Sequence, residues 1–207
     1  MPNSLELNVS PAQLHTFANH PFHVRKDMEM NELVDSIRES GVIVPLIVRT
    51  RPEGGYEIIS GHRRCEACRE LGIEKVPVRV QELTDDEATI LMVNSNIQRE
   101  HVLPSEKAFA YRMKLEAVKR TAGRPIKNSC QVGTNYRADK NVAETSSESA
   151  RTIQRYIRLT YLIPEFLEKM DKGEIALSVG VELSFLDESS QREVLEQCAI
   201  NDCTPSY

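Results

Sequence analysis

The chain has 207 residues, of which 40% are hydrophobic and 28% are charged, and its formal net charge is -5. This composition suits a chain that buries one or two cores, and it excludes collagen and intrinsic disorder. No apolar run reaches the roughly 18 residues of a membrane span, and the N-terminus lacks the basic and apolar segments of a signal peptide. We therefore expect a cytoplasmic protein without a membrane partner.

The net charge changes sign along the chain. Counting Lys and Arg against Asp and Glu gives −5 for residues 1–96, +7 for residues 97–160 and −7 for residues 161–207. A basic middle segment is typical of a surface that binds a polyanion such as DNA. A solvated basic helix face is the alternative.

The five cysteines indicate reduced thiols, because their number is odd and the chain looks cytosolic. Cys65 and Cys68 lie three residues apart on an expected amphipathic helix, so we expect core or half-buried thiols. A zinc site would need a second Cys or His pair, and no pair in the chain is convincing.

The first half of the chain has the pattern of a compact α+β unit. Helical spacing of apolar residues ends at Gly41, and Thr84 with Glu87 forms a capping box. Two β-rich runs are joined by a Gly-containing connection that suits a hairpin. In chain order, we expect a helix at 29–40, strands at 46–49 and 56–60, a helix at 62–71, a strand at 76–80 and a helix from about 85.

The second half predicts only helices. The first runs from Pro104 to about Arg120, with an apolar stripe made of Phe109, Met113, Leu115 and Val118. Residues 121–138 have too few periodic apolar residues for a packed element and indicate a basic loop. Further helices are expected at residues 140–145, 149–160, 164–172 and 189–198.

A candidate anion site lies where the second strand passes into a helix, at Gly61-His62-Arg63-Arg64. Unpaired backbone N–H groups and the positive end of the helix dipole favour an anion such as a triphosphate there. Glycine allows a close approach of the backbone, and the two arginines add donors for phosphate oxygens. Solvated arginines at a helix start are the alternative.

A second polar cluster, residues 94–100, ends the capping-box helix. Its amides and Arg99 suit phosphates or a metal-bound water. The same residue types also suit a helix end that links two domains.

Five motifs follow one another along the chain. They are Leu33–Ile37 with Gly41 and Pro45, Tyr56–Arg64, Val76–Val78, Asn96–Arg99, and Pro104 with Glu106 and Ala108. Together these motifs resemble the ParB-type partition proteins over residues 20–186. The resemblance implies an α+β fold, with a small ParB/sulfiredoxin-like N-terminal domain followed by an all-α helix-turn-helix domain. It further implies a protein that binds a centromere-like DNA site and uses CTP to close as a clamp sliding along DNA.

Matched position by position, the motifs of the family imply a set of residues that bind CTP. They are Arg25, Gly61, His62, Arg63, Arg64, Ser95, Asn96, Gln98 and Arg99, with Asn96 also toward Mg²⁺. His62 and Ser95 each replace a Glu of the family, and His23 replaces a Gln. A hydroxyl is a poorer Mg²⁺ ligand than a carboxylate, so we expect CTP binding to survive where hydrolysis does not. Gly61 stands in the place of the sulfiredoxin catalytic cysteine, which leaves no nucleophile there.

A helix-turn-helix is expected near residues 139–160. The N-terminal half of its second helix, from Ser149, would enter the major groove, where Arg reads guanine and small polar residues reach phosphate. The expected DNA contacts are Ser149, Arg151, Thr152 and Arg155, with Arg124 and Lys127 of the basic loop. An ordinary helical hairpin is the alternative.

We expect a nucleotide-binding domain at residues 1–99 and a DNA-binding domain at 100–207. The leading function is sequence-specific binding of double-stranded DNA in segregation of a plasmid, mobile element or chromosome, gated by CTP. Two alternatives stay open: a CTP hydrolase with timed turnover, and a nucleotide-independent transcriptional regulator or nucleoid-associated protein. The resemblance also implies a homodimer, a ParA-type ATPase as partner, and a place on the nucleoid or a plasmid.

Overall fold

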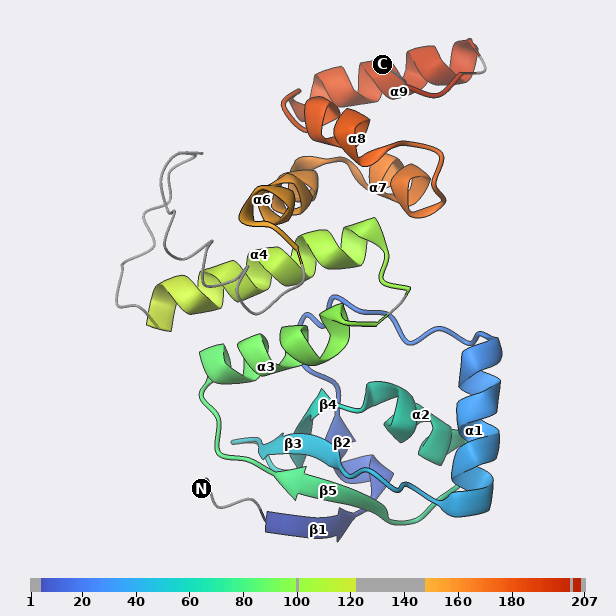
Figure 1. Ribbon diagram of the computed structural model, residues 1–207, viewed down its shortest axis with the longest axis vertical. Coiled ribbons are helices and arrows are strands. Elements are labelled where there is room, and N and C mark those ends of the chain that lie inside the picture. The colour runs from blue at the N-terminus through green and yellow to red at the C-terminus, as the bar shows by residue number, and fades with distance from the viewer. Residues whose placement is uncertain (1–4, 100, 122–147, 202, 206–207) are drawn as a thin grey trace. The chain divides into compact units, whose positions relative to one another are not determined.

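The computed structural model describes residues 5–99, 101–121, 148–201 and 203–205. The chain divides into two compact units, unit 1 up to Asn96 and unit 2 from Ile97, while the sequence placed the boundary at residue 99. Unit 1 contains a five-stranded sheet with helices, and the described part of unit 2 is helical (Figure 1). The fold is therefore α+β. None of the described helices combines the length and apolar character that a membrane crossing demands.

The sheet of unit 1 has the strand order β1-β5-β3-β4-β2. The strands are β1 (Leu5–Val9), β2 (Leu14–His15), β3 (Leu46–Thr50), β4 (Tyr56–Ser60) and β5 (Val76–Val80), with the 3-10 helix η1 (Pro11–Gln13) before β2. The predicted hairpin is confirmed, because β3 and β4 pair antiparallel. The two edge strands, β1 and β2, were not predicted.

Helices α1 (Met28–Ser40) and α2 (His62–Glu70) pack their apolar residues against the sheet, and both were predicted. Asp27 caps α1, because its Oδ1 accepts a hydrogen bond from the Met30 N–H at 2.9 Å. Cys65 and Cys68 of α2 lie in this core, as expected, and burial raises the pKa of both thiols.

Helix α3 (Asp85–Ile97) begins at the predicted capping box. The Thr84 N–H donates to Glu87 Oε2 at 2.9 Å, and the Glu87 N–H donates to Thr84 Oγ1 at 3.3 Å. Hydrogen bonds from the backbone and hydroxyl of Thr84 hold the pKa of the Glu87 carboxyl below its usual value. The first turn of α3 is therefore fixed by its own sequence.

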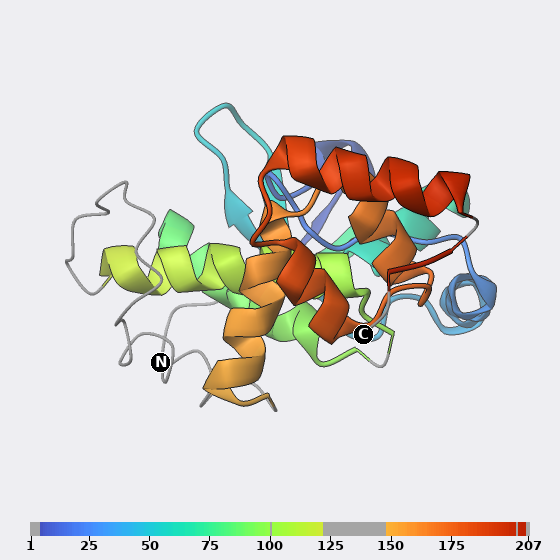
Figure 2. The same ribbon diagram turned by 90° about the horizontal axis from the view of Figure 1, so that it is seen from above.

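The described helices of unit 2 are α4 (Pro104–Thr121), α6 (Ala150–Arg158), α7 (Pro164–Asp171), α8 (Leu177–Leu183) and α9 (Glu188–Ile200), with the 3-10 helix η2 (Leu159–Tyr161). Helix α6 lies across α4, as Figures 1 and 2 both show. At the crossing, Ile153 packs against Tyr111 and Leu115.

Four helices predicted for unit 2 are confirmed, namely α4, α6, α7 and α9, and α8 was missed. Phe109, expected on the apolar stripe of α4, is instead 41% exposed, whereas Tyr111 is buried. The helix predicted at 140–145 and the basic loop beyond Thr121 lie outside the described residues.

Candidate functional site: the start of helix α2

Helix α2 begins at a glycine in the left-handed backbone region. Gly61 is its N-cap residue, with φ of 107° and ψ of 23°, and no side chain caps the helix. A Cβ atom at Gly61 would lie 2.8 Å from Leu46 Cγ and 3.1 Å from Arg64 Nη2, so only glycine fits without a shift. The first N–H groups of α2 are thus left for an anion.

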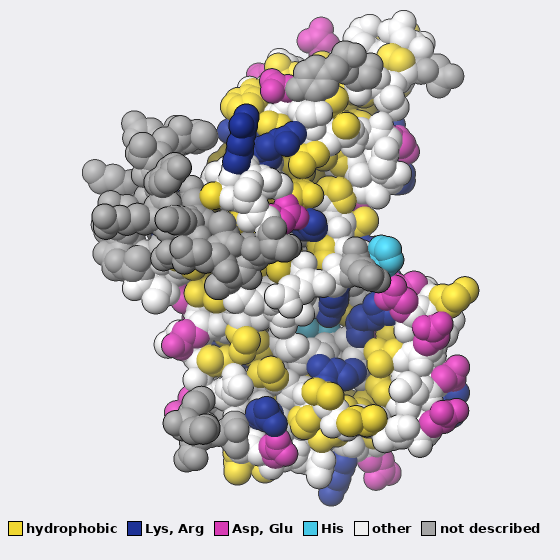
Figure 3. Space-filling model, viewed as in Figure 1, with side chains coloured by type: hydrophobic (Ala, Val, Ile, Leu, Met, Phe, Trp, Pro, Cys, Tyr) yellow, Lys and Arg dark blue, Asp and Glu magenta, His cyan; other side chains and the backbone are white. Residues whose placement is uncertain are grey.

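Arg63 bridges α2 to the start of α1. Its Nη2 donates to Asp27 Oδ1 at 2.8 Å, and its Nη1 donates to Glu29 Oε2 at 3.0 Å. Figure 3 shows Lys and Arg side chains over the start of α2, beside Asp and Glu side chains over the start of α1. Arg63 was predicted from the sequence, whereas both carboxylates were missed, because the helix cap at Asp27 gives no sign of a partner outside α1.

Arg64 binds the segment between α1 and β3. Its Nη1 donates to the backbone carbonyls of Val44 and of Pro45, the latter at 3.2 Å. Burial lowers the pKa of Arg64, and its two acceptors are neutral. A guanidinium in this setting gains from an anionic acceptor.

His62, the first residue of α2, packs against His20. The ring centroids of His62 and His20 are 4.0 Å apart, and His62 is buried. His20 Nδ1 lies 2.6 Å from the Phe22 carbonyl oxygen. Arg25 is half-buried in the irregular segment that follows, between β2 and α1. The first residue of α2 therefore makes an aromatic contact with the segment before α1.

The predicted residues at the end of α3 are positioned by that helix itself. Ser95 Oγ donates to the Met92 carbonyl at 2.9 Å, and Asn96 Nδ2 donates to the same carbonyl at 2.7 Å. Asn96 Oδ1 is buried and accepts no hydrogen bond from the described residues. A buried amide oxygen of this kind fits a hard cation as ligand. Gln98 and Arg99 follow α3 and belong to unit 2.

The predicted DNA-reading helix, α6, has a well-defined start. Ser149 is its N-cap, with Oγ accepting from the Thr152 N–H at 3.1 Å and lying 2.8 Å from Thr152 Oγ1. Arg151 is exposed and Arg155 is half-buried, while Ile153 faces the core. Both arginines were predicted as DNA contacts. Arg124 and Lys127 lie outside the described residues.

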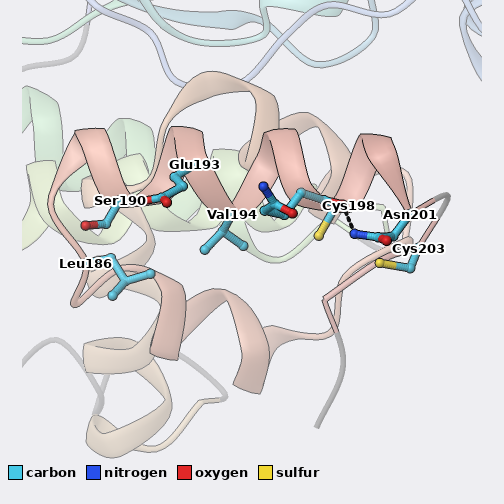
Figure 4. A pocket seen from close by; sticks show the side chains of 8 residues that line it. Leu186, Ser190, Glu193, Val194, Cys198, Asn201 and Cys203 are labelled. Carbon is cyan, nitrogen blue, oxygen red and sulfur yellow. Dashed lines mark hydrogen bonds between the residues drawn. The ribbon is translucent and has the colours of Figure 1, made fainter.

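A groove of about 400 Å³ runs along α9, and none of the residues that line it was predicted as a site residue (Figure 4). It is lined by Leu186, Ser190, Glu193, Val194, Gln197, Cys198, Asn201 and Cys203. Burial, with a smaller contribution from Cys203, raises the pKa of the Cys198 thiol. This lining includes a carboxylate and lacks a cation, so the groove does not suit a phosphate.

Comparison with known proteins relates both units to partition proteins. Residues 3–97 match the family described as ParB N-terminal domain. The chromosome-partitioning protein Spo0J of Thermus thermophilus is 35% identical over 173 residues, which are 81% of this chain and 57% of that protein. A probable chromosome-partitioning protein ParB of Chlamydia trachomatis is 31% identical, over 95% of this chain and 65% of that protein. The chain thus spans somewhat over half the length of these relatives.

Solved structures share the fold. A C-terminally truncated chromosome-partitioning protein ParB from Caulobacter crescentus, complexed to the centromeric parS site, gives a TM-score of 0.56 at 20% identity, over 96% of this chain and 94% of that one. A Pnob8-like ParB-N domain gives a TM-score of 0.61 at 16% identity, over 96% of this chain and 86% of that one. Unit 1 is thus similar to the ParB N-terminal domain over nearly its whole length, and the chain as a whole is similar to chromosome-partitioning proteins.

The geometry at Gly61 predicts an unequal cost for two glycine substitutions that flank α2. Gly72 also has a positive φ, 66°, but a Cβ there would meet nothing within 4 Å. We expect Gly72→Ala to cost about 1 kcal/mol of unfolding free energy, from backbone strain alone. Gly61→Ala adds the contact with Leu46 and should cost at least about 2 kcal/mol. Urea unfolding followed by circular dichroism measures both, and equal costs would contradict the crowding at Gly61.

Proposed function

We propose that this chain binds a specific site on double-stranded DNA in the segregation of a chromosome, plasmid or mobile element, and that CTP gates this binding. One observation carries the proposal. The similarity to the Thermus thermophilus chromosome-partitioning protein runs over 173 residues, which is longer than unit 1 and so includes part of unit 2. A homodimer, a ParA-type ATPase as partner and a place on the nucleoid or a plasmid belong to the same proposal.

Helix α6 supports the DNA-binding part. Its start is capped by Ser149, and Arg151 and Arg155 lie away from the buried Ile153. Arginine side chains near the start of a recognition helix reach guanine in the major groove. The Caulobacter crescentus relative in this fold was crystallised on its centromeric parS site. We assign Arg151 and Arg155 to base contacts on these grounds, and Ser149 and Thr152 to phosphate.

The start of α2 supports the CTP-binding part. Gly61 has no side chain to cap the first backbone N–H groups of α2. Arg63 and Arg64 extend from the first turn of the same helix. This arrangement fits a triphosphate. Asn96, through its buried Oδ1, is the residue that fits Mg²⁺, which would neutralise phosphate charge. We also assign Arg25 and His62 to this site, and we keep Gln98 and Arg99 as CTP contacts that the resemblance implies.

A DNA-binding protein without nucleotide control is the second candidate. One observation favours it: Arg63 and Arg64 both have acceptors within the protein. Turnover of CTP is disfavoured, because Ser95 offers a hydroxyl that already donates to the Met92 carbonyl.

The DNA assignment predicts two different effects on binding. Arg151→Ala or Arg155→Ala should lower the discrimination between a selected duplex and a scrambled duplex, by ~1–3 kcal/mol for the Arg that pairs with guanine. Arg124→Ala with Lys127→Ala should weaken binding to both duplexes equally and flatten the salt dependence, since each phosphate contact adds about −0.9 to the log–log slope. Salt-dependent titrations measure both effects. If the α6 variants lose the same factor on both duplexes, the helix only positions the protein on phosphates.

The nucleotide assignment predicts binding of CTP, and not of ATP, that depends on two arginines. Arg63→Ala with Arg64→Ala should weaken CTP binding at least about tenfold, because hydrogen bonds to charged groups contribute roughly 1.5–3 kcal/mol each. Arg38→Ala with Arg79→Ala is the matched control, since both arginines form exposed ion pairs elsewhere in unit 1. Calorimetry measures the affinities. Undiminished affinity in the Arg63 and Arg64 variant would remove the start of α2 from the site, and absence of CTP binding would favour the second candidate.

A further inference from the structure

Two consecutive arginines of α2 hold the two flanks of α1. Arg63 binds Asp27, the N-cap residue of α1, and Glu29 in its first turn. Arg64 binds the carbonyls of Val44 and Pro45, which lie between the end of α1 and β3. The same two side chains are the cations beside the N–H groups of α2 that no side chain caps. The contacts that fix α1 are therefore made by the groups best placed to bind phosphate.

The contacts of Arg63 with Asp27 and Glu29 can be replaced by contacts with phosphate at a small cost in stability. The side chains of Asp27 and Glu29 are 39% and 57% exposed, so water solvates both carboxylates if the arginine leaves. Ion pairs to exposed carboxylates contribute little to stability. The carboxylates of Asp27 and Glu29 offset the positive charges of Arg63 and Arg64, so these four side chains carry no net charge at the start of α2. The carboxylates therefore weaken the attraction of this helix start for a polyphosphate.

The Arg64 contacts are suited to exchange for another reason. The guanidinium is partly buried, and its acceptors are the neutral carbonyls of Val44 and Pro45. A phosphate oxygen is a stronger acceptor for a buried guanidinium than a carbonyl is. The segment that would be released carries exposed apolar side chains, Ile43 at 79% and Val44 at 62%.

We propose that Arg63 and Arg64 form an exchangeable latch on α1, which holds its two flanks in the free protein and releases them when both arginines turn to the phosphates of a nucleotide. The proposal rests on the proposed binding of CTP at α2. Release changes the position of Met28, Ile43 and Val44, which are exposed apolar residues on the latched segments. Nucleotide binding would thus alter an apolar surface of unit 1 at the two ends of one helix.

The first test removes the competing carboxylates. Asp27→Asn keeps a good N-cap for α1, and Glu29→Gln keeps the shape of the side chain. The double variant should bind CTP about three- to tenfold more tightly than the unaltered protein, since the arginines no longer leave ionic partners. Glu32→Gln with Glu39→Gln removes two exposed carboxylates from the same helix without touching Arg63 and is the matched control. It should change the affinity less than about twofold.

The second test follows the segment that Arg64 holds. The chain has no tryptophan, so Ile43→Trp supplies a single fluorescent reporter at a largely exposed position. Added CTP should lower its anisotropy, because the segment is released. Leu5→Trp, on β1 and 61% exposed, is the control for changes in overall tumbling and should not show this fall.

The outcomes separate the latch from the function on which it rests. CTP affinity of the Asp27 and Glu29 variant equal to or weaker than that of its control would show that the carboxylates do not compete, and would overturn the latch. Unchanged anisotropy at position 43 in protein saturated with CTP would overturn it as well. If the unaltered protein and every variant fail to bind CTP, the proposed nucleotide control fails, and the latch fails with it.

Discussion

The left-handed backbone at Gly61 is the constraint on which the candidate site depends. It turns the chain from β4 directly into α2, and it leaves no side chain over the first N–H groups of that helix. Arg64 Nη2 lies close to where a Cβ atom would project, so the absence of a side chain at Gly61 also makes room for the guanidinium. An open helix start and two adjacent arginines thus follow from one residue, and both suit a polyphosphate.

The elements predicted correctly are those whose signals are local. The capping box at Thr84 and the hairpin between β3 and β4 each lie within a short stretch of sequence. The missed elements depend on distant partners. Strand β1 forms by pairing with β5, far along the chain, and β2 has too few residues to show alternation. Helix α8 contains a poor helix former, Gly180, which packs closely against the end of the Met170 side chain.

The site residues, like the elements, were predicted where their signals are local. Gly61, Arg63 and Arg64 lie close together in the sequence, as do Ser149 and Arg151. Residue type and position at a helix start were therefore enough to identify them. The acceptors at Asp27, Glu29, Val44 and Pro45 come from segments on both sides of α1, and the sequence gives no distance between them and α2. These contacts change the interpretation of the arginines. In the free protein both arginines have acceptors of their own, and the proposed nucleotide would have to compete with those acceptors.

The proposals above depend on the binding of nucleotide phosphates at the start of α2. A heteronuclear NMR titration of isotope-labelled protein with CTP tests this binding most directly, because backbone amide resonances report on hydrogen bonds to an anion. We expect the amides of His62, Arg63 and Arg64 to shift most and to saturate together. Shifts confined to other segments, such as the α9 groove, or no shift at all, would contradict it.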